Sequence, residues 1–113
     1  MDLVNHSTMN RFEIWVIEFD PSRGAEIKKT RPAVIVSPDA MNRHLQTVIV
    51  APLTSTIKGY PSRVLTTFEN KGGEVMLDQL RSVDKIRLKK KVGELETYEA
   101  EAVCQVLTVM FQL

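Results

Sequence analysis

The sequence is poor in cysteine and has no long apolar run. Cys104 is the single cysteine of the 113 residues, and no apolar stretch approaches the about 20 residues that a membrane-spanning helix needs. One cysteine excludes an internal disulfide and fits a reducing compartment. The N-terminal stretch MDLVNHSTMN lacks the basic start and the apolar centre of a signal peptide. We therefore expect a cytoplasmic protein that does not associate with membranes.

The sequence also has little net charge. With 43% apolar and 26% charged residues, the composition is that of a globular protein, and a net charge of +1 argues against an indiscriminate polyanion binder. The two histidines and the lone cysteine lack the spacing of a zinc site, so we expect no metal and no cofactor. The length fits one domain, which we assign to residues 11–113, with residues 1–10 as a short flexible tail.

Short apolar runs separated by turn residues predict strands. The predicted strands cover residues 11–19, 33–37, 47–53, 63–68 and 74–82. Pro52 suggests an edge or a bulge in the third of them, and the sequence from Asn70 to Gly73 is a strong turn signal. Between the first two strands, residues 20–31 form a polar loop that is long enough to be functional.

The C-terminal segment has a different period. From Thr97 onward, apolar residues recur at positions i, i+3 and i+4, as on one face of an amphipathic helix, and Thr97 is its predicted N-cap. Five or six short strands followed by one closing helix predict a mainly β fold. We expect a small, partly open β-barrel with a C-terminal helix rather than a parallel sheet.

The spacing of two strands predicts that two side chains meet. Strands 33–37 and 47–53 flank a connection centred near residue 42, and antiparallel residues at equal distance from that centre lie side by side. Arg31 and Thr54 meet this condition. An arginine binds phosphate oxygens bidentately, and a neighbouring hydroxyl can donate to the same group. On spacing alone, a surface salt bridge beside an ordinary strand end is the more common arrangement.

Four stretches are distinctive when they are taken together. They are EIWVIEFDPSRGAE at 13–26, TRPAVIVSP at 30–38, VIVAPLTSTIKGYP at 48–61 and LDQLRSVD at 77–84. In this order and spacing, over nearly the whole chain from residue 11, they resemble the MazF/PemK/Kid family of toxin ribonucleases. The resemblance implies the toxin of a type II toxin–antitoxin system. It also implies an SH3-like barrel that forms a homodimer and binds a cognate antitoxin.

The resemblance further implies sequence-specific, metal-independent cleavage of single-stranded RNA. It places the family's catalytic arginine on Arg31, its catalytic hydroxyl on Thr54, its loop glutamate on Glu26, and the aspartate proposed as a general base in one subgroup on Asp78. The side chains expected to contact RNA are Lys28, Lys29, Ser55, Lys58, Tyr60 and Gln79. The two basic loop residues among them are also expected to receive the acidic tail of the antitoxin.

The implied chemistry is attack of a ribose 2′-hydroxyl on its own phosphate, which gives a 2′,3′-cyclic phosphate and a 5′-hydroxyl. Arg31 would stabilise the charge that develops on the phosphoryl oxygens, and Thr54 would hold the phosphate with help from Ser55. Glu26 and Asp78 are both candidates for the base that takes the 2′ proton.

Three positions depart from the family pattern. The subgroup that uses the aspartate also has a histidine and an arginine where this chain has Ala25 and Met76, so the mechanism based on Arg31 and Thr54 is the better match. Phe12 replaces a glycine that is usual at the start of the first strand.

Two other functions are compatible with such a fold. The CcdB toxins are similar in fold but poison gyrase by protein binding, through residues of the C-terminal helix, and they lack the arginine–threonine pair. A catalytically silent module that only engages an antitoxin is the third hypothesis. Arg31→Ala separates the three, because it should abolish RNA cleavage and growth arrest only in a nuclease.

Overall fold

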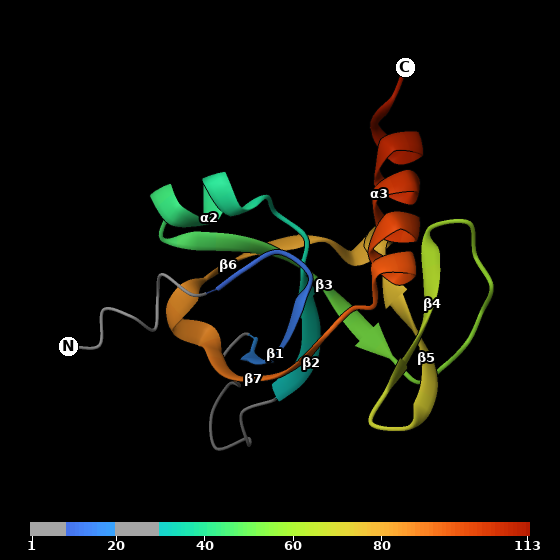
Figure 1. Cartoon of the computed structure of the whole chain (residues 1–113), viewed down its shortest axis with the longest axis horizontal. Helices are drawn as coiled ribbons and strands as arrows, with labels where there is room; N and C mark the ends of the chain where they lie inside the picture. The colour runs from blue at the N-terminus through green and yellow to red at the C-terminus, as the bar shows by residue number, and fades with distance from the viewer. Residues whose placement is uncertain (1–8, 20–29) are drawn as a thin grey trace, which may run out of the picture.

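The computed structural model describes residues 9–19 and 30–113, which form a curled antiparallel sheet with one long helix beside it (Figure 1). The strands are β1 (Glu13–Glu18), β2 (Thr30–Ile35), β3 (Thr47–Thr54), β4 (Arg63–Phe68), β5 (Lys71–Met76), β6 (Arg81–Asp84) and β7 (Leu88–Glu94). The helices are α2 (Asp39–His44) and α3 (Thr97–Phe111), and two short 3-10 helices, η1 (Leu77–Gln79) and η2 (Lys85–Arg87), flank β6. The predicted mainly β fold with a C-terminal helix is confirmed, with seven strands in the described residues rather than five or six.

The strand β3 joins the two parts of the sheet. The strands follow the order β4-β5-β3-β2-β1-β7, and β6 pairs with β3 outside this path. β3 pairs with β6 from Thr47 to Val50, and its end pairs with β5 from Leu53 onward. Pro52 lies in the gap between these two partners. A residue without an N–H fits at such a break, which explains a proline in a strand that is not at an edge.

The core is divided between the two faces of β2 and β3. Successive strand residues point to opposite faces. Val34 belongs to a cluster that also contains Val103 of α3, whereas Ala33 and Ile35 belong to a second cluster formed with β1, β3, β6 and the start of β7. All of these side chains are fully buried. The middle of β2 is therefore packed on both faces, and this packing positions Thr30 and Arg31 at the start of the strand.

A capping box begins α3. Glu96 is the N-cap, and its N–H donates to Oε1 of Glu99 at 2.8 Å. The predicted N-cap, Thr97, was wrong by one residue. Glu99 is buried, and its Oε2 accepts the hydroxyl of Thr66 on β4 at 2.8 Å. The same carboxylate therefore caps the helix and ties it to the sheet.

The strand and turn predicted between residues 69 and 82 differ from the structure. Residues 74–82 do not form one strand, because η1 with the buried Leu77 separates β5 from β6. The turn lies at Glu69 and Asn70, with φ of 53° and 64°, and Lys71 already belongs to β5. Positive φ at both central residues is the type I′ geometry, which fits the twist of a hairpin.

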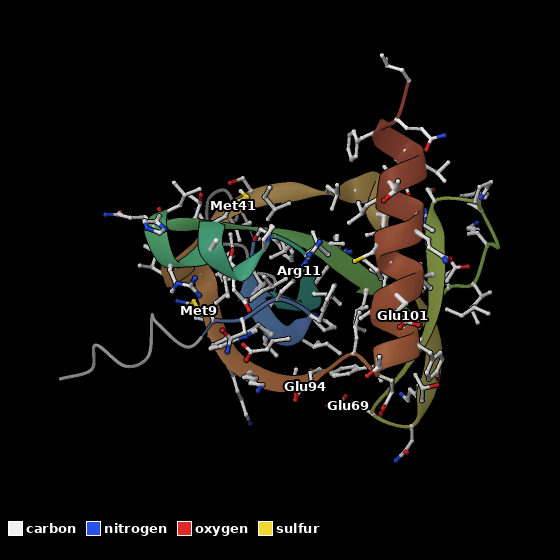
Figure 2. The ribbon with its side chains drawn as sticks, turned by 45° about the horizontal axis from the view of Figure 1, so that its top comes forward. Met9, Arg11, Met41, Glu69, Glu94 and Glu101 are labelled. Carbon is white, nitrogen blue, oxygen red and sulfur yellow. The ribbon has the colours of Figure 1, made fainter. Side chains whose placement is uncertain are left out.

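The first described residues already pack on the sheet. Met9 is buried in the second cluster, and the N–H of Arg11 donates to Asp39 of α2 at 2.7 Å (Figure 2). Phe12, at the position where the resemblance expects glycine, has a φ of 71°, a conformation that glycine adopts most easily. The rest of the predicted tail, residues 1–8, lies outside the described residues. In the described part of the chain, no helix is long and apolar enough to cross a membrane.

Candidate active site

Arg31 and Thr54 lie at matching ends of β2 and β3. The register of these strands pairs Ala33 with Pro52, and both strands extend further in the same direction to include Arg31 and Thr54. Continued by two residues beyond Ala33 and Pro52, the same register would bring Arg31 opposite Thr54. Antiparallel partners have Cα atoms roughly 4.5–5.5 Å apart and side chains on one face. Arg31 is exposed and Thr54 is half-buried, so an anion can reach both side chains.

Thr54 is held by β5 and by the segment that follows it. On the side away from β2 it pairs with Glu74 of β5. Its Oγ1 accepts the N–H of Thr56 at 3.1 Å, which orients the side chain and leaves the hydroxyl hydrogen to be donated. The exposed Ser55 follows directly. The end of β3 therefore presents a held hydroxyl, that of Thr54, and an exposed one, that of Ser55.

Gly73 allows β5 to approach the end of β3 closely. A Cβ atom at this position would lie 2.3 Å from the carbonyl oxygen of Thr54 and 3.2 Å from its carbonyl carbon. Both atoms are backbone, so a side chain at residue 73 would displace the strand that holds Thr54. The sequence indicates Gly73 only as part of a turn signal. The steric need for glycine becomes visible when β3 and β5 are paired.

A buried carboxylate organises residues 55–62, the segment that follows Thr54. Glu74 is 1% exposed, and its Oε2 accepts the N–H of Gly59 at 2.8 Å and of Lys58 at 3.0 Å. Its Oε1 accepts Nη1 of Arg63 at 3.1 Å. The bond from Gly59, followed by those from Lys58 and Arg63, lowers the pKa of Glu74 despite its burial. Glu74 thus stays charged and fixes the segment on the active-site side of β5.

Asp78 is engaged by the same arginine. Nε of Arg63 donates to Oδ1 of Asp78 at 2.7 Å, and the hydroxyl of Ser62 donates to the same oxygen at 2.9 Å. The hydrogen bond from Arg63 lowers the pKa of Asp78 to about 2. Asp78 is therefore a carboxylate at neutral pH with little affinity for a proton, and it holds Arg63 in place.

Arg63 also supports Tyr60. Its guanidinium carbon lies 4.9 Å from the centroid of the Tyr60 ring, within the range of a cation–π contact. The N–H of Arg63 donates to the carbonyl of Tyr60 at 3.0 Å. The tyrosine is 49% exposed, so a supported aromatic ring faces solvent near the predicted RNA site.

The chain matches a known family along almost its whole length. The sequence profile of that family, described as PemK-like, MazF-like toxin of type II toxin-antitoxin system, matches residues 10–111. The chain belongs to this family. The endoribonuclease MazF9 of Mycobacterium tuberculosis is 34% identical over 115 residues, which cover 93% of this chain and 98% of that protein. The endoribonuclease toxin MazF of Escherichia coli is 37% identical over 70 residues, 62% of each chain.

Solved structures of PemK/MazF-like toxins have the same fold. MazF from Deinococcus radiodurans superposes with a TM-score of 0.74 and 27% identity, over 92% of this chain and 96% of that one. A MazE–MazF structure from the same organism has a TM-score of 0.75 and 29% identity, over 89% and 93% of the two chains. The resemblance and the fold class expected from the sequence are both confirmed.

The predicted site residues of this PemK/MazF-like chain fall into three described groups. These are Arg31, Thr54 and Ser55 at strand ends, Lys58 and Tyr60 in the segment 55–62, and Asp78 and Gln79 in η1. Arg63 and Glu74 connect the last two groups, and sequence reasoning missed both. Arg63 is the only charged residue of β4, whereas Glu74 shares β5 with Lys71 and has no distinctive signal in the sequence. Glu26, Lys28 and Lys29 lie outside the described residues, so their predicted roles stay predictions.

Proposed function

We propose that the chain is the toxin of a type II toxin–antitoxin pair and that it cleaves single-stranded RNA with Arg31 and Thr54 at the centre of its active site. The observation that supports this proposal is the β2–β3 register, which, if continued by two residues, brings a guanidinium and a hydroxyl to one strand end. The relatives named endoribonuclease support RNA as the substrate.

The reaction is a transesterification that needs only groups of the protein and of the RNA. The ribose 2′-oxygen forms a bond to the adjacent phosphorus and the bond from phosphorus to the 5′-oxygen breaks, which gives a 2′,3′-cyclic phosphate and a 5′-hydroxyl. Arg31 stabilises the charge on the phosphoryl oxygens, and Thr54 donates its hydroxyl hydrogen to one of them, with Ser55 beside it. DNA lacks the nucleophile, so it binds without being cut.

A base must take the 2′ proton, and the leaving 5′-oxygen must gain one. Of the two candidates, Asp78 has a pKa of about 2 and is hydrogen-bonded to Arg63, which favours a structural role for this carboxylate. We therefore assign proton acceptance to Glu26 and keep Asp78 as a support of the site. Glu26→Gln should then lower kcat more than Asp78→Asn does.

The proposed RNA contacts lie around this centre. They are Lys28, Lys29, Ser55, Lys58, Tyr60 and Gln79. A cognate antitoxin restrains the enzyme, and the MazE–MazF structure of the relative supports such a partner. In this proposal the antitoxin covers the same surface, and the active form is a homodimer in the cytoplasm. Charge reversal of the two loop lysines should weaken the antitoxin complex, and unchanged affinity would refute their part in it.

The test uses purified protein and a long RNA in EDTA, followed by mapping of the cut ends. We expect cuts at a short sequence with 5′-hydroxyl and 2′,3′-cyclic phosphate ends, and no cut where a 2′-deoxy nucleotide replaces the attacking one. Arg31→Ala should lower cleavage by at least about a hundredfold, the scale of removing one donor to a developing oxyanion. The matched control is Arg43→Ala, an exposed arginine in α2 at the opposite end of the β2–β3 pair. Growth arrest that survives Arg31→Ala would instead support a gyrase poison.

A further inference from the structure

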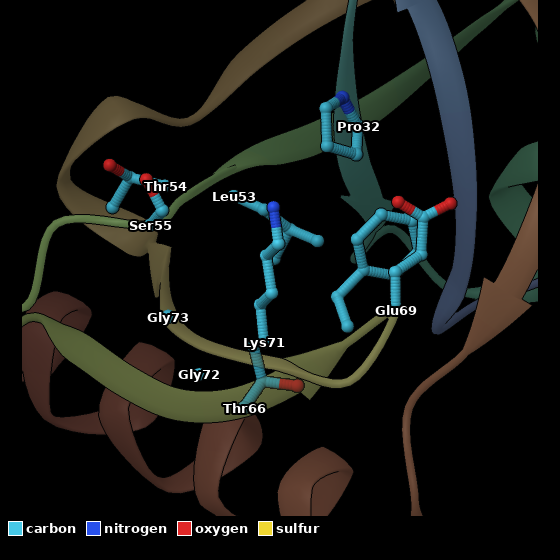
Figure 3. Close-up of a pocket in the computed structure, with 10 residues that line it drawn as sticks. Pro32, Leu53, Thr54, Ser55, Thr66, Glu69, Lys71, Gly72 and Gly73 are labelled. Atoms are coloured by element: carbon cyan, nitrogen blue, oxygen red, sulfur yellow. The ribbon is translucent and has the colours of Figure 1, made fainter.

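A hollow of about 280 Å³ lies beside Thr54, between the end of β3 and the β4–β5 hairpin (Figure 3). Thr54 and Ser55 line one end of it, and Pro32 and Leu53 form an apolar wall. No role in the chemistry proposed above uses this space. It is continuous with the proposed active site because the same threonine borders both.

The β4–β5 hairpin brings an aromatic ring, a cation and a carboxylate to this hollow. Phe68 and Lys71 are cross-strand partners, and the type I′ turn sets Glu69 directly after Phe68. Figure 3 shows the Lys71 side chain extending from β5 across the hollow and the Glu69 carboxylate near Pro32. Within residues 9–19 and 30–113, neither Glu69 nor Lys71 forms an ion pair, so both have hydrogen-bonding capacity for a ligand.

The floor of the hollow is built to stay open. Gly72 and Gly73 contribute no side chains to it, and Gly73 has no room for one. The hydroxyl of Thr66 is already donated to Glu99, so Thr66 adds no unpaired polar group. The polar side chains that can contact a ligand therefore lie at the rim of the hollow, and its interior is apolar.

We propose that this hollow is a base-binding subsite that takes one nucleobase of the RNA strand next to the scissile phosphate. This inference rests on the function proposed above. Its volume lies just below the range of roughly 300–1,000 Å³ that drug-sized ligands occupy, which suits a single base. Bases that proteins read in single-stranded RNA stack on aromatic rings and form hydrogen bonds along their edges. Phe68 supplies the ring, Lys71 donates to a base oxygen or nitrogen, and Glu69 accepts an amino or imino hydrogen.

The subsite is a determinant of sequence specificity and takes no part in bond breaking. Its loss should therefore change which base is accepted at one position, while cleavage of the RNA continues. The distinguishing variants are Glu69→Gln and Lys71→Ala, both at exposed positions of the hairpin. Their matched controls are Glu101→Gln, an exposed glutamate of α3 (Figure 2), and Lys90→Ala, an exposed lysine of β7.

The experiment measures kcat/KM for a pool of RNA substrates randomised around the cut site, by sequencing of the cleaved ends. In both hairpin variants we expect the preference at one flanking position to fall by at least about tenfold, the scale of one lost polar base contact. The controls should keep the wild-type profile. A non-cleavable RNA with a 2′-deoxy nucleotide at the attack site and 2-aminopurine at the affected position should show quenched fluorescence with wild type and recovered fluorescence with Lys71→Ala.

Each outcome separates the subsite from the nuclease itself. An unchanged preference at every position in both hairpin variants overturns the subsite and leaves the nuclease proposal intact, provided that Arg31→Ala is inactive. An unchanged preference together with weaker antitoxin binding would assign the hollow to the antitoxin instead. Wild-type protein that does not cut RNA would refute the proposed function, and the subsite would fail with it.

Discussion

Replacement of Gly73 by alanine tests the coupling between β5 and the active site most directly. The new Cβ would lie 2.3 Å from the carbonyl oxygen of Thr54, whereas non-bonded heavy atoms prefer about 3.5 Å or more. The strands must therefore separate by about 1 Å. Because β4 holds β5 on its other edge and β2 holds β3, the displacement is concentrated at Thr54. Overpacking of this kind costs roughly 1–3 kcal/mol of stability.

The effect on cleavage should appear in protein that is still fully folded. A misplacement of about 1 Å in a catalytic group can lower the rate by about a hundredfold. We expect kcat/KM of Gly73→Ala to fall by about that factor at a temperature where urea titration shows the variant to be fully folded. The loss should appear in kcat, since in the proposed mechanism Thr54 acts on the phosphate during bond exchange.

Two glycines provide matched controls. A Cβ at Gly72 would meet only the Ile57 side chain, at 4.0 Å, so Gly72→Ala should unfold at nearly the wild-type urea concentration. Gly72 also lines the hollow, so cleavage is compared with Gly93→Ala as well, whose Cβ would lie 3.8 Å from Ile14 and 3.9 Å from Phe68, both ordinary contacts that require no displacement. The close approach of β5 to Thr54 is refuted if Gly73→Ala has the urea midpoint of Gly72→Ala and the kcat/KM of Gly93→Ala.

Two further outcomes follow from the carboxylates around Arg63. Glu74→Gln should lower kcat/KM by roughly tenfold, mainly through KM, because the 55–62 segment loses its charged acceptor; kinetics equal to those of Glu101→Gln would contradict this. The pKa of Asp78 in the folded protein, about 2, lies below its ordinary value of 3.8. The carboxylate therefore stabilises the fold fully above pH 3.8, and this stabilisation disappears as the pH falls toward 2. Urea midpoints measured from pH 5 to pH 2 should therefore fall less steeply in Asp78→Asn, and parallel curves would argue against the Arg63 pairing.

The features predicted correctly from the sequence depend on local periodicity or on symmetric spacing. α3 follows from its apolar repeat, and only its first residue was misassigned, because Glu99 selects Glu96 rather than Thr97 as the N-cap. The β2–β3 register also agrees with the counting as far as Ala33 opposite Pro52, since a connection with a defined centre fixes the register of the strands around it. The meeting of Arg31 and Thr54, two residues further along, stays a prediction.

The features that were missed depend on contacts between distant segments. The apolar run at 74–82 has the composition of one strand, and only the packing of Leu77 explains why η1 interrupts it. Likewise, Glu74 has no visible role until β5 lies beside β3 and its carboxylate meets the N–H groups of the 55–62 segment. Neither arrangement leaves a short-range pattern in the sequence.

The change of partners along β3 has a consequence for when the chain becomes active. In a molecule whose β4–β5 hairpin has not docked, the part built on β1, β2, β3, β6 and β7 contains Arg31, but Thr54 lacks its β5 partner. In the proposed mechanism, docking of the β4–β5 hairpin completes the active site, because it fixes Thr54 through Glu74. We therefore expect a molecule with a detached hairpin to leave RNA intact, so that on heating cleavage is lost at the temperature at which this hairpin detaches.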